Sequence, residues 1–240
     1  MTHDLSSEFA PSAAAAAPGD DQFSFARLLK DRIIFVAGPV TMESSLSVVG
    51  QLLFLAKNPA AKEKGIDMYI MSPGGAVDGG MAIVDAMNFV KNKGITIRTT
   101  AMGLAMSMGS VILVNGSPGH RYCTPSARIM LHEPSGGAQG KTADMNNTVA
   151  EAQHMKRSMA SLYKLTTKMS EETIEKHILS GPDAYMYGEE AKELGIVDDV
   201  AYPDAEHMMG IAEMQQRLSR FHADEKVARK ARDNSLFPKP

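Results

Sequence analysis

Apolar residues recur along the chain at two different spacings, and each spacing predicts a type of secondary structure. Segments 32–36, 67–71 and 95–100 are short, rich in apolar and β-branched residues, and followed by glycine or proline, which is typical of strands. Segments 45–56 and 81–90 instead have apolar residues three and four positions apart, which predicts amphipathic helices. Strands that alternate with helices predict an α/β fold.

The second half of the chain continues this alternation. We expect strands around Cys123 and Met130, while segment 111–114 fits either a helix or a strand. A long amphipathic helix should follow, because apolar side chains recur at intervals of three or four residues: Met145, Val149, Ala152, Met155, Met159 and Leu162. A methionine-rich stripe of this kind is more typical of a core or a subunit contact than of a cofactor site.

Composition divides the chain into three parts. Residues 1–22 are rich in serine, alanine and proline, and we expect them to be flexible. Residues 23–202 should form one folded domain. Residues 203–240 should form a helical, charged extension, because apolar residues with helical spacing precede a charged tail: Ile211, Met214, Leu218 and Phe221.

Charge and hydropathy exclude several classes of protein. The chain has 240 residues, of which 44% are hydrophobic and 22% charged, as in ordinary globular proteins. A net charge of -3 argues against nucleic acid as a partner, and no apolar run is long enough to span a membrane. The N-terminus lacks the pattern of a signal or transit peptide, and Cys123 is the only cysteine. We therefore expect a cytoplasmic protein without disulfides.

Two segments carry candidate chemistry. Ser107 lies in a turn of small and apolar residues between Gly103 and Gly109, where a hydroxyl would be exposed. His132 ends an apolar run, and a serine nucleophile needs a general base of this type. The backbone N–H of Met108, at an expected helix start, could stabilise an oxyanion, and the turn 72–75 could offer a second donor.

The carboxylate that would orient His132 cannot be chosen from composition, because the chain has 28 acidic residues. Asp183 is one candidate, in a loop that we expect between two helical segments. Segment 137–142 resembles the end of a phosphate-binding loop, but Ser135 stands where that motif requires its first glycine. ATP binding at this segment is therefore not expected.

From about residue 28 to 200 the chain closely resembles the proteolytic subunit of the ATP-dependent Clp (caseinolytic) protease. Seven matching segments occur in the family's order: 28–35, 51–55, 69–75, 103–109, 129–134, 136–140 and 190–198. The resemblance implies a crotonase-like α/β fold of repeated strand-strand-helix units. It also implies a protruding handle, formed by residues 136–140 and the long helix after them.

The resemblance further implies the roles of individual residues in a serine endopeptidase. Ser107 would be the nucleophile, His132 the base and Asp183 the acid that orients it. Gly75 and Met108 would donate to the oxyanion, and Gly136 and Gly137 would bind substrate by strand addition. No cofactor and no metal are implied.

Partners also follow from the resemblance. Unfolded polypeptides would be the substrates, fed by a separate AAA+ ATPase into a homo-oligomer of two stacked seven-membered rings. The family usually has a charged residue, commonly arginine, directly before the catalytic aspartate, where this chain has Pro182. Two alternatives remain: a non-catalytic or partner-dependent ring subunit of the same type, and a crotonase-type enzyme acting on acyl-coenzyme A.

Overall fold

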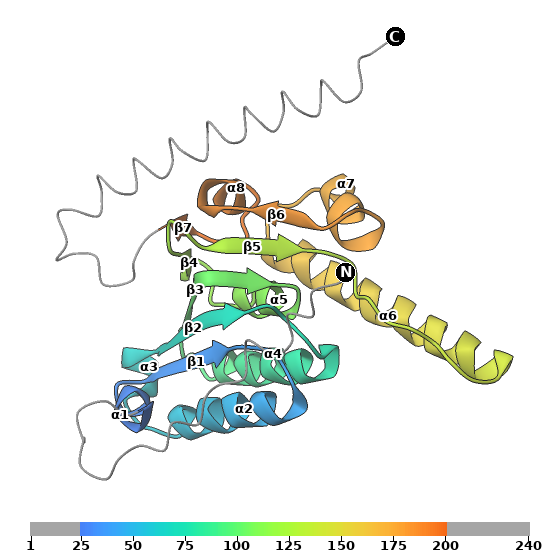
Figure 1. The fold of residues 1–240 in the computed structure, drawn as a ribbon. Helices are drawn as coiled ribbons and strands as arrows, with labels where there is room; N and C mark the ends of the chain where they lie inside the picture. Colours follow the sequence, from blue (N-terminus) through green and yellow to red (C-terminus); the bar gives the residue numbers. More distant parts are fainter. Residues whose placement is uncertain (1–24, 201–240) are drawn as a thin grey trace, which may run out of the picture.

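A seven-stranded, mostly parallel sheet organises the part of the chain that the structure describes (Figure 1). The computed structural model describes residues 25–200. Strands follow the order β1-β2-β3-β4-β7, with β5 paired to β3 and β6 antiparallel to β5. Their bounds are β1 Ile33–Ala37, β2 Ile66–Ser72, β3 Ile97–Met106, β4 Arg121–Cys123, β5 Arg128–Leu131, β6 Ala184–Met186 and β7 Asp199–Val200.

Helices cover the sheet and bury its apolar side chains. The long ones are α2 (Met42–Ala56), α4 (Val77–Asn92) and α6 (Thr142–Thr166). The shorter ones are α1 Phe25–Lys30, α3 Ala61–Lys64, α5 Met108–Val114, α7 Glu171–Ile174, a π-helical turn Glu175–Leu179, and α8 Gly188–Glu193. Contacts between α2 and α4, α4 and α5, and α5 and α6 make these four helices neighbours. Fully buried Leu52, Ile70 and Ile112 belong to the resulting core.

Strand β3 has different neighbours along its length. Its first half pairs with β4, with Thr99 opposite Arg121, and its second half pairs with β5, with Met106 opposite Met130. On its other side β3 pairs with β2. The carboxyl ends of β2, β3 and β5 therefore lie next to one another, and residues that follow these strands share one edge of the sheet.

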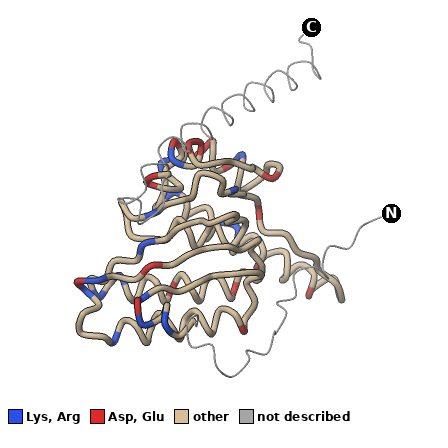
Figure 2. Tube along the Cα trace, turned by 60° about the vertical axis from the view of Figure 1, so that its left-hand side comes forward, with Lys and Arg blue, Asp and Glu red and all other residues tan. Residues whose placement is uncertain are grey.

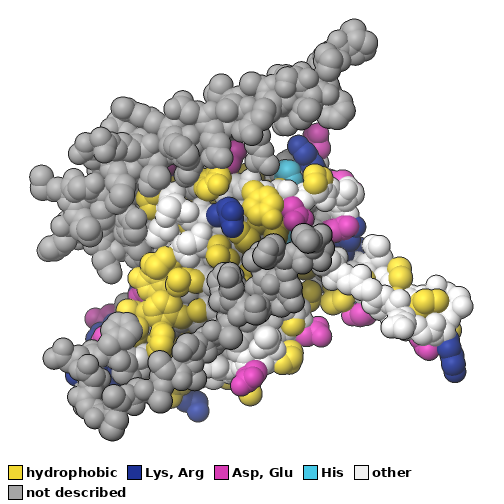
Figure 3. All heavy atoms as spheres, viewed as in Figure 1, with side chains coloured by type: hydrophobic (Ala, Val, Ile, Leu, Met, Phe, Trp, Pro, Cys, Tyr) yellow, Lys and Arg dark blue, Asp and Glu magenta, His cyan; other side chains and the backbone are white. Residues whose placement is uncertain are grey.

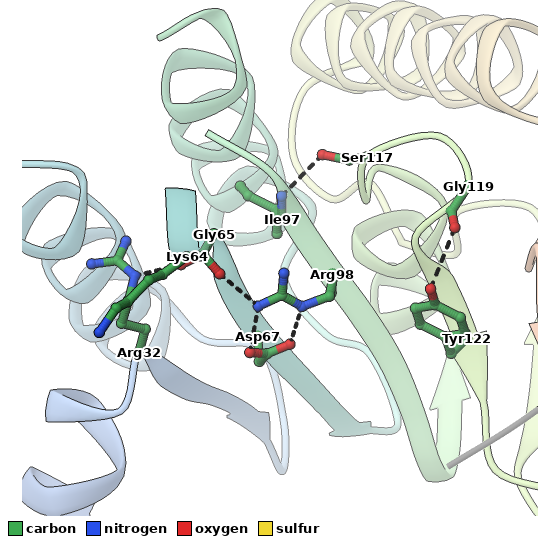
Figure 4. Close-up of polar contacts among 9 residues, drawn as sticks. All are labelled: Arg32, Lys64, Gly65, Asp67, Ile97, Arg98, Ser117, Gly119 and Tyr122. Atoms are coloured by element: carbon green, nitrogen blue, oxygen red, sulfur yellow. Dashed lines mark hydrogen bonds and ion pairs between the residues drawn. The ribbon is translucent and has the colours of Figure 1, made fainter. Parts of the chain in front are cut away.

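An ion pair fixes the opposite end of β2 and β3 (Figure 4). Asp67 and Arg98 are register partners, with Arg98 Nε 2.5 Å from Asp67 Oδ1 and Nη2 2.7 Å from Oδ2. These hydrogen bonds raise the pKa of Arg98. Arg98 also donates to the Lys64 carbonyl at 2.9 Å, and Arg32 donates to the Gly65 carbonyl. A shift in strand register would separate Asp67 from Arg98, so this ion pair supports the alignment of the two strands.

Helix α6 protrudes from the body of the protein (Figure 1). Its C-terminal part is anchored by buried Met159 and Tyr163, whereas Val149 nearer its start is 53% exposed. Isolated hydrophobic side chains appear along the protruding part (Figure 3). At the base, Lys156 Nζ lies 2.7 Å from Glu133 Oε2, which joins the helix to the segment after β5.

Charges of both signs are distributed along the described part of the chain (Figure 2). No helix within residues 25–200 is long and apolar enough to cross a membrane.

The predicted α/β fold with a protruding helix is confirmed. Segment 111–114 is helical, within α5, and β3 continues past the expected residues 95–100 as far as Met106. Asp183 follows the π-helical turn and directly precedes strand β6, so its expected position between two helical segments is wrong. The reason is long-range: residues 184–186 pair with β5. The expected segments 1–22 and 203–240 lie outside the described residues.

Candidate active site

Ser107 occupies a strained turn between β3 and α5. Its backbone has φ 51° and ψ -124°, a left-handed conformation that is uncommon for residues other than glycine. The Ser107 N–H donates to the Met130 carbonyl at 3.0 Å, which ties the turn to the neighbouring strand β5. Strain of this kind costs about 1–3 kcal/mol and persists where the surrounding structure enforces it, commonly at functional sites.

His132 lies beside this serine because it follows β5, the neighbour of β3. Its Nε2 is 2.8 Å from Ser107 Oγ, a hydrogen-bond distance. The His132 side chain is 21% exposed, so the pair is accessible and still partly shielded from water. A neutral imidazole with its proton on Nδ1 can accept the Ser107 hydroxyl proton in this arrangement.

Asp183 lies on the other side of the same imidazole. Leu131 pairs with Ala184, so His132 and Asp183 stand at the next antiparallel position. Asp183 Oδ1 is 3.4 Å from His132 Nδ1, and the Asp183 side chain is 52% exposed. This distance is longer than a direct hydrogen bond, so the carboxylate faces the neutral ring without being held tightly against it, and a charge interaction arises only when the imidazole is protonated.

Two glycines after β2 allow close backbone packing, Gly74 against the serine turn and Gly75 against Val40. A Cβ at Gly74, where φ is 96°, would lie 2.5 Å from Ser107 Cβ and 2.8 Å from the Met106 carbonyl oxygen. A Cβ at Gly75, where φ is 145°, would lie 2.2 Å from the Val40 carbonyl oxygen. Ser72 supports the turn, donating to the Gly38 carbonyl at 2.6 Å and accepting from the Gly74 N–H at 3.1 Å.

Two backbone donors remain available at this edge of the sheet. Among residues 25–200, neither the Gly75 N–H nor the Met108 N–H has a hydrogen-bond acceptor. Met108 directly follows the serine, and Gly75 belongs to the glycine turn that packs against it. A serine, a histidine, a carboxylate and free N–H groups form the constellation that acyl transfer requires.

A family model for Clp protease matches residues 19–204. The chain belongs to the Clp protease family. Membership makes it a peptidase of the Clp type and implies a proteolytic subunit that works with Clp-type ATPases. The recognition based on sequence segments is thereby confirmed.

Three further residues of this Clp protease named in the sequence analysis are Gly136, Gly137 and Cys123. Gly136 and Gly137 are exposed in the irregular segment between β5 and α6, and a Cβ at either would meet no atom within 4 Å. Cys123 is fully buried, and burial raises the pKa of its thiol to about 12, which leaves it protonated at neutral pH. Within residues 25–200, no group of three or more His, Cys, Asp or Glu side chains is placed to hold a metal ion.

Two buried hydroxyl groups behind the serine were not expected from the sequence. Ser110 Oγ lies 2.6 Å from the Ser107 carbonyl oxygen, 3.1 Å from the Met130 carbonyl oxygen and 2.8 Å from Tyr163 Oη. Ser110 is one helical turn after the nucleophile candidate, a spacing that could have drawn attention to it. Tyr163 comes from α6, and nothing in its local sequence indicates this contact.

Proposed function

We propose that this Clp protease is a serine endopeptidase in which Ser107 is the nucleophile and His132 the general base. The observation that carries the proposal is the 2.8 Å contact between Ser107 Oγ and His132 Nε2 at a strained strand-to-helix turn. A hydroxyl is a weak nucleophile by itself, and an adjacent base removes its proton as it attacks.

The reaction proceeds in two stages. Ser107 Oγ attacks the carbonyl carbon of the peptide while its proton passes to His132 Nε2. The carbonyl oxygen becomes an oxyanion, for which the N–H groups of Gly75 and Met108 are the proposed donors. His132 then gives its proton to the leaving amine, and an ester on Ser107 remains. In the second stage water attacks the ester carbonyl carbon while His132 takes its proton, and His132 then returns that proton to Ser107 Oγ as the acid product leaves.

Asp183 is the proposed orienting acid. Its carboxylate faces His132 Nδ1 and favours the tautomer that leaves Nε2 free to accept a proton. It also stabilises the imidazolium that forms during attack. The 3.4 Å separation suggests that substrate binding shortens this contact, because catalytic hydrogen bonds are often long before substrate is bound.

Unfolded polypeptides are the proposed substrates. Gly136 and Gly137 lie in an exposed, irregular segment four and five residues after His132, where an extended peptide could add as a strand and be read through its backbone. We further propose two stacked seven-membered rings of this chain enclosing the sites, an AAA+ ATPase that delivers substrate, and a cytoplasmic location. A single buried cysteine suits a reducing compartment.

Hydrolysis of a fluorogenic peptide by the purified protein tests the proposal. Ser107→Ala should lower kcat by about 10⁴-fold or more, because the members of a triad act as a unit. Ser161→Ala is the matched control, since the hydroxyl of this exposed serine on α6 bonds only the Arg157 carbonyl, at 2.9 Å, among residues 25–200. Turnover by Ser107→Ala close to that of the control would contradict the proposal.

A further inference from the structure

A buried hydroxyl pair lies directly behind the candidate nucleophile. Ser110 is fully buried and Tyr163 is 1% exposed. Ser110 Oγ reaches the carbonyl oxygens of Ser107 at 2.6 Å and Met130 at 3.1 Å, and its remaining neighbour is Tyr163 Oη at 2.8 Å. Buried hydroxyls are costly unless they are hydrogen-bonded, so the pair needs a consistent direction of donation.

The number of protons fixes that direction. Each hydroxyl has one proton, and Ser110 Oγ is the only hydrogen-bond partner of Tyr163 Oη within residues 25–200. Tyr163 must therefore donate to Ser110, or its proton would be buried without an acceptor. Ser110 is then free to donate to the Ser107 carbonyl, its shortest contact. Burial raises the pKa of Tyr163, which keeps the phenol protonated and able to donate.

The acceptor matters because of the peptide unit to which it belongs. The carbonyl of Ser107 and the N–H of Met108 are in one rigid trans plane and point in opposite directions. A group that fixes the carbonyl therefore also fixes the N–H. The Ser107 carbonyl additionally accepts the backbone N–H groups of Ser110 at 2.9 Å and Val111 at 3.2 Å, so the hydroxyl adds to an existing anchor.

We propose that Ser110 and Tyr163 are positioning residues that aim the Met108 N–H at the oxyanion. The Tyr163 hydroxyl donates to Ser110 Oγ, and the Ser110 hydroxyl donates to the Ser107 carbonyl. This inference rests on the proposed function. The pair touches no substrate, and its effect appears where charge develops on the reacting oxygen. Because such preorganisation acts on the transition state, its loss lowers kcat and leaves KM nearly unchanged.

Tyr163→Phe and Ser110→Ala test the inference, since each removes one hydroxyl and little else. Complete loss of an oxyanion donor costs about 10²–10³-fold in kcat, and a donor that is only less well aimed should cost less, about 10-fold for Ser110→Ala and about 5-fold for Tyr163→Phe. KM should stay within about twofold. Affinity for a peptide boronate, whose tetrahedral adduct on Ser107 mimics the oxyanion, should weaken in parallel with kcat.

Thr99→Val controls for the loss of a buried hydroxyl as such. Thr99 is fully buried, and its Oγ1 donates to the Leu113 carbonyl at 2.9 Å, near the far end of the same helix α5. We expect this variant to lose thermal stability comparably but to keep its kcat and its boronate affinity. An equal loss of kcat in Thr99→Val would overturn the inference, because general loosening of α5 would explain all three variants.

The inference and the proposed function fail differently. A wild-type enzyme that works through Ser107, with both Tyr163→Phe and Ser110→Ala within twofold of wild-type kcat, overturns the inference alone. Wild-type turnover by Ser107→Ala overturns the proposed function, and the inference with it. A reduced kcat with unchanged KM and weakened boronate binding, confined to the two hydroxyl variants, supports both.

Discussion

His132 and Asp183 occupy the position directly beyond the last antiparallel pair of β5 and β6, Leu131 opposite Ala184. The sheet itself thus brings the imidazole and the carboxylate to within 3.4 Å of each other. The nearby turn also restricts the backbone, because a Cβ at Gly181 would lie 1.6 Å from the Lys176 carbonyl oxygen of the π-helical turn. Strand pairing and this tight turn together determine where the carboxylate lies.

Replacement of the proposed orienting acid should impair turnover more than binding. Asp183→Asn removes the charge that stabilises the imidazolium, and its amide group can favour the wrong tautomer of His132. We expect kcat to fall by about 10³-fold with little change in KM, as measured with a fluorogenic peptide. Asp78→Asn, a change in the first turn of α4, is the control. A kcat within a few-fold of wild type would show that another group orients His132.

The glycine turn after β2 should tolerate no side chain. Gly74→Ala would place a methyl group 2.5 Å from Ser107 Cβ at a φ of 96°, so the backbone must move or accept strain. We expect a loss of about 2 kcal/mol in the free energy of unfolding, and a large loss of peptidase activity.

Gly50→Ala is the matched control for this substitution. A Cβ at Gly50, inside helix α2, would meet no atom within 4 Å. The control should gain about 0.5–1 kcal/mol in stability through helix propensity and keep its activity. Normal activity in Gly74→Ala would contradict the close approach between this turn and Ser107.

Acid should weaken the ion pair between Asp198 and Arg121, whose guanidinium also donates to the Thr166 carbonyl at the C-terminal end of α6. Burial alone would raise the pKa of Asp198, but hydrogen bonds and the charge of Arg121, 2.6 Å away, outweigh burial and lower it. A carboxyl with a lowered folded-state pKa contributes stability above its unfolded pKa of about 3.9, and loses that contribution as pH falls through the folded value.

Asp198→Asn should therefore destabilise the protein at pH 7, and its difference from wild type should shrink as pH falls from about 5 to below 3. Chemical denaturation over this pH range measures the difference. Asp85→Asn is the control, because Asp85 is exposed on α4 and has no ion pair among residues 25–200. A difference that stays constant with pH would show that the Asp198 contribution does not depend on its charge.

The proposed stacking of rings should depend only weakly on salt. Pro182 cannot supply the ion pair that an arginine would make, whereas the protruding part of α6 presents apolar side chains such as Val149, which is 53% exposed. Hydrophobic contact is little affected by ionic strength, unlike exposed ion pairs. Analytical ultracentrifugation across a salt series should show a nearly constant fraction of double rings. Steep dissociation at high salt would point to charged contacts elsewhere.

Local patterns along the sequence predicted most of the sheet and the helices but missed features created by distant contacts. The sequence predicts that strand β3 ends near Thr100, because it leads into the expected turn between Gly103 and Gly109. In the fold Gly103 adopts a φ of 72° within the strand, which continues through pairing with β5. The bond between Tyr163 and Ser110 joins positions far apart in the chain, and no local periodicity reports such a contact.

Covalent labelling with a fluorophosphonate, located by peptide mass spectrometry, tests the central claim most directly. The reagent attacks only an activated serine, so the 2.8 Å contact between Ser107 and His132 predicts a single adduct on Ser107. Labelling should be lost in Ser107→Ala and strongly slowed in His132→Ala, while Ser161→Ala reacts like wild type. An adduct on another serine, or equal labelling of Ser107→Ala, would contradict the account.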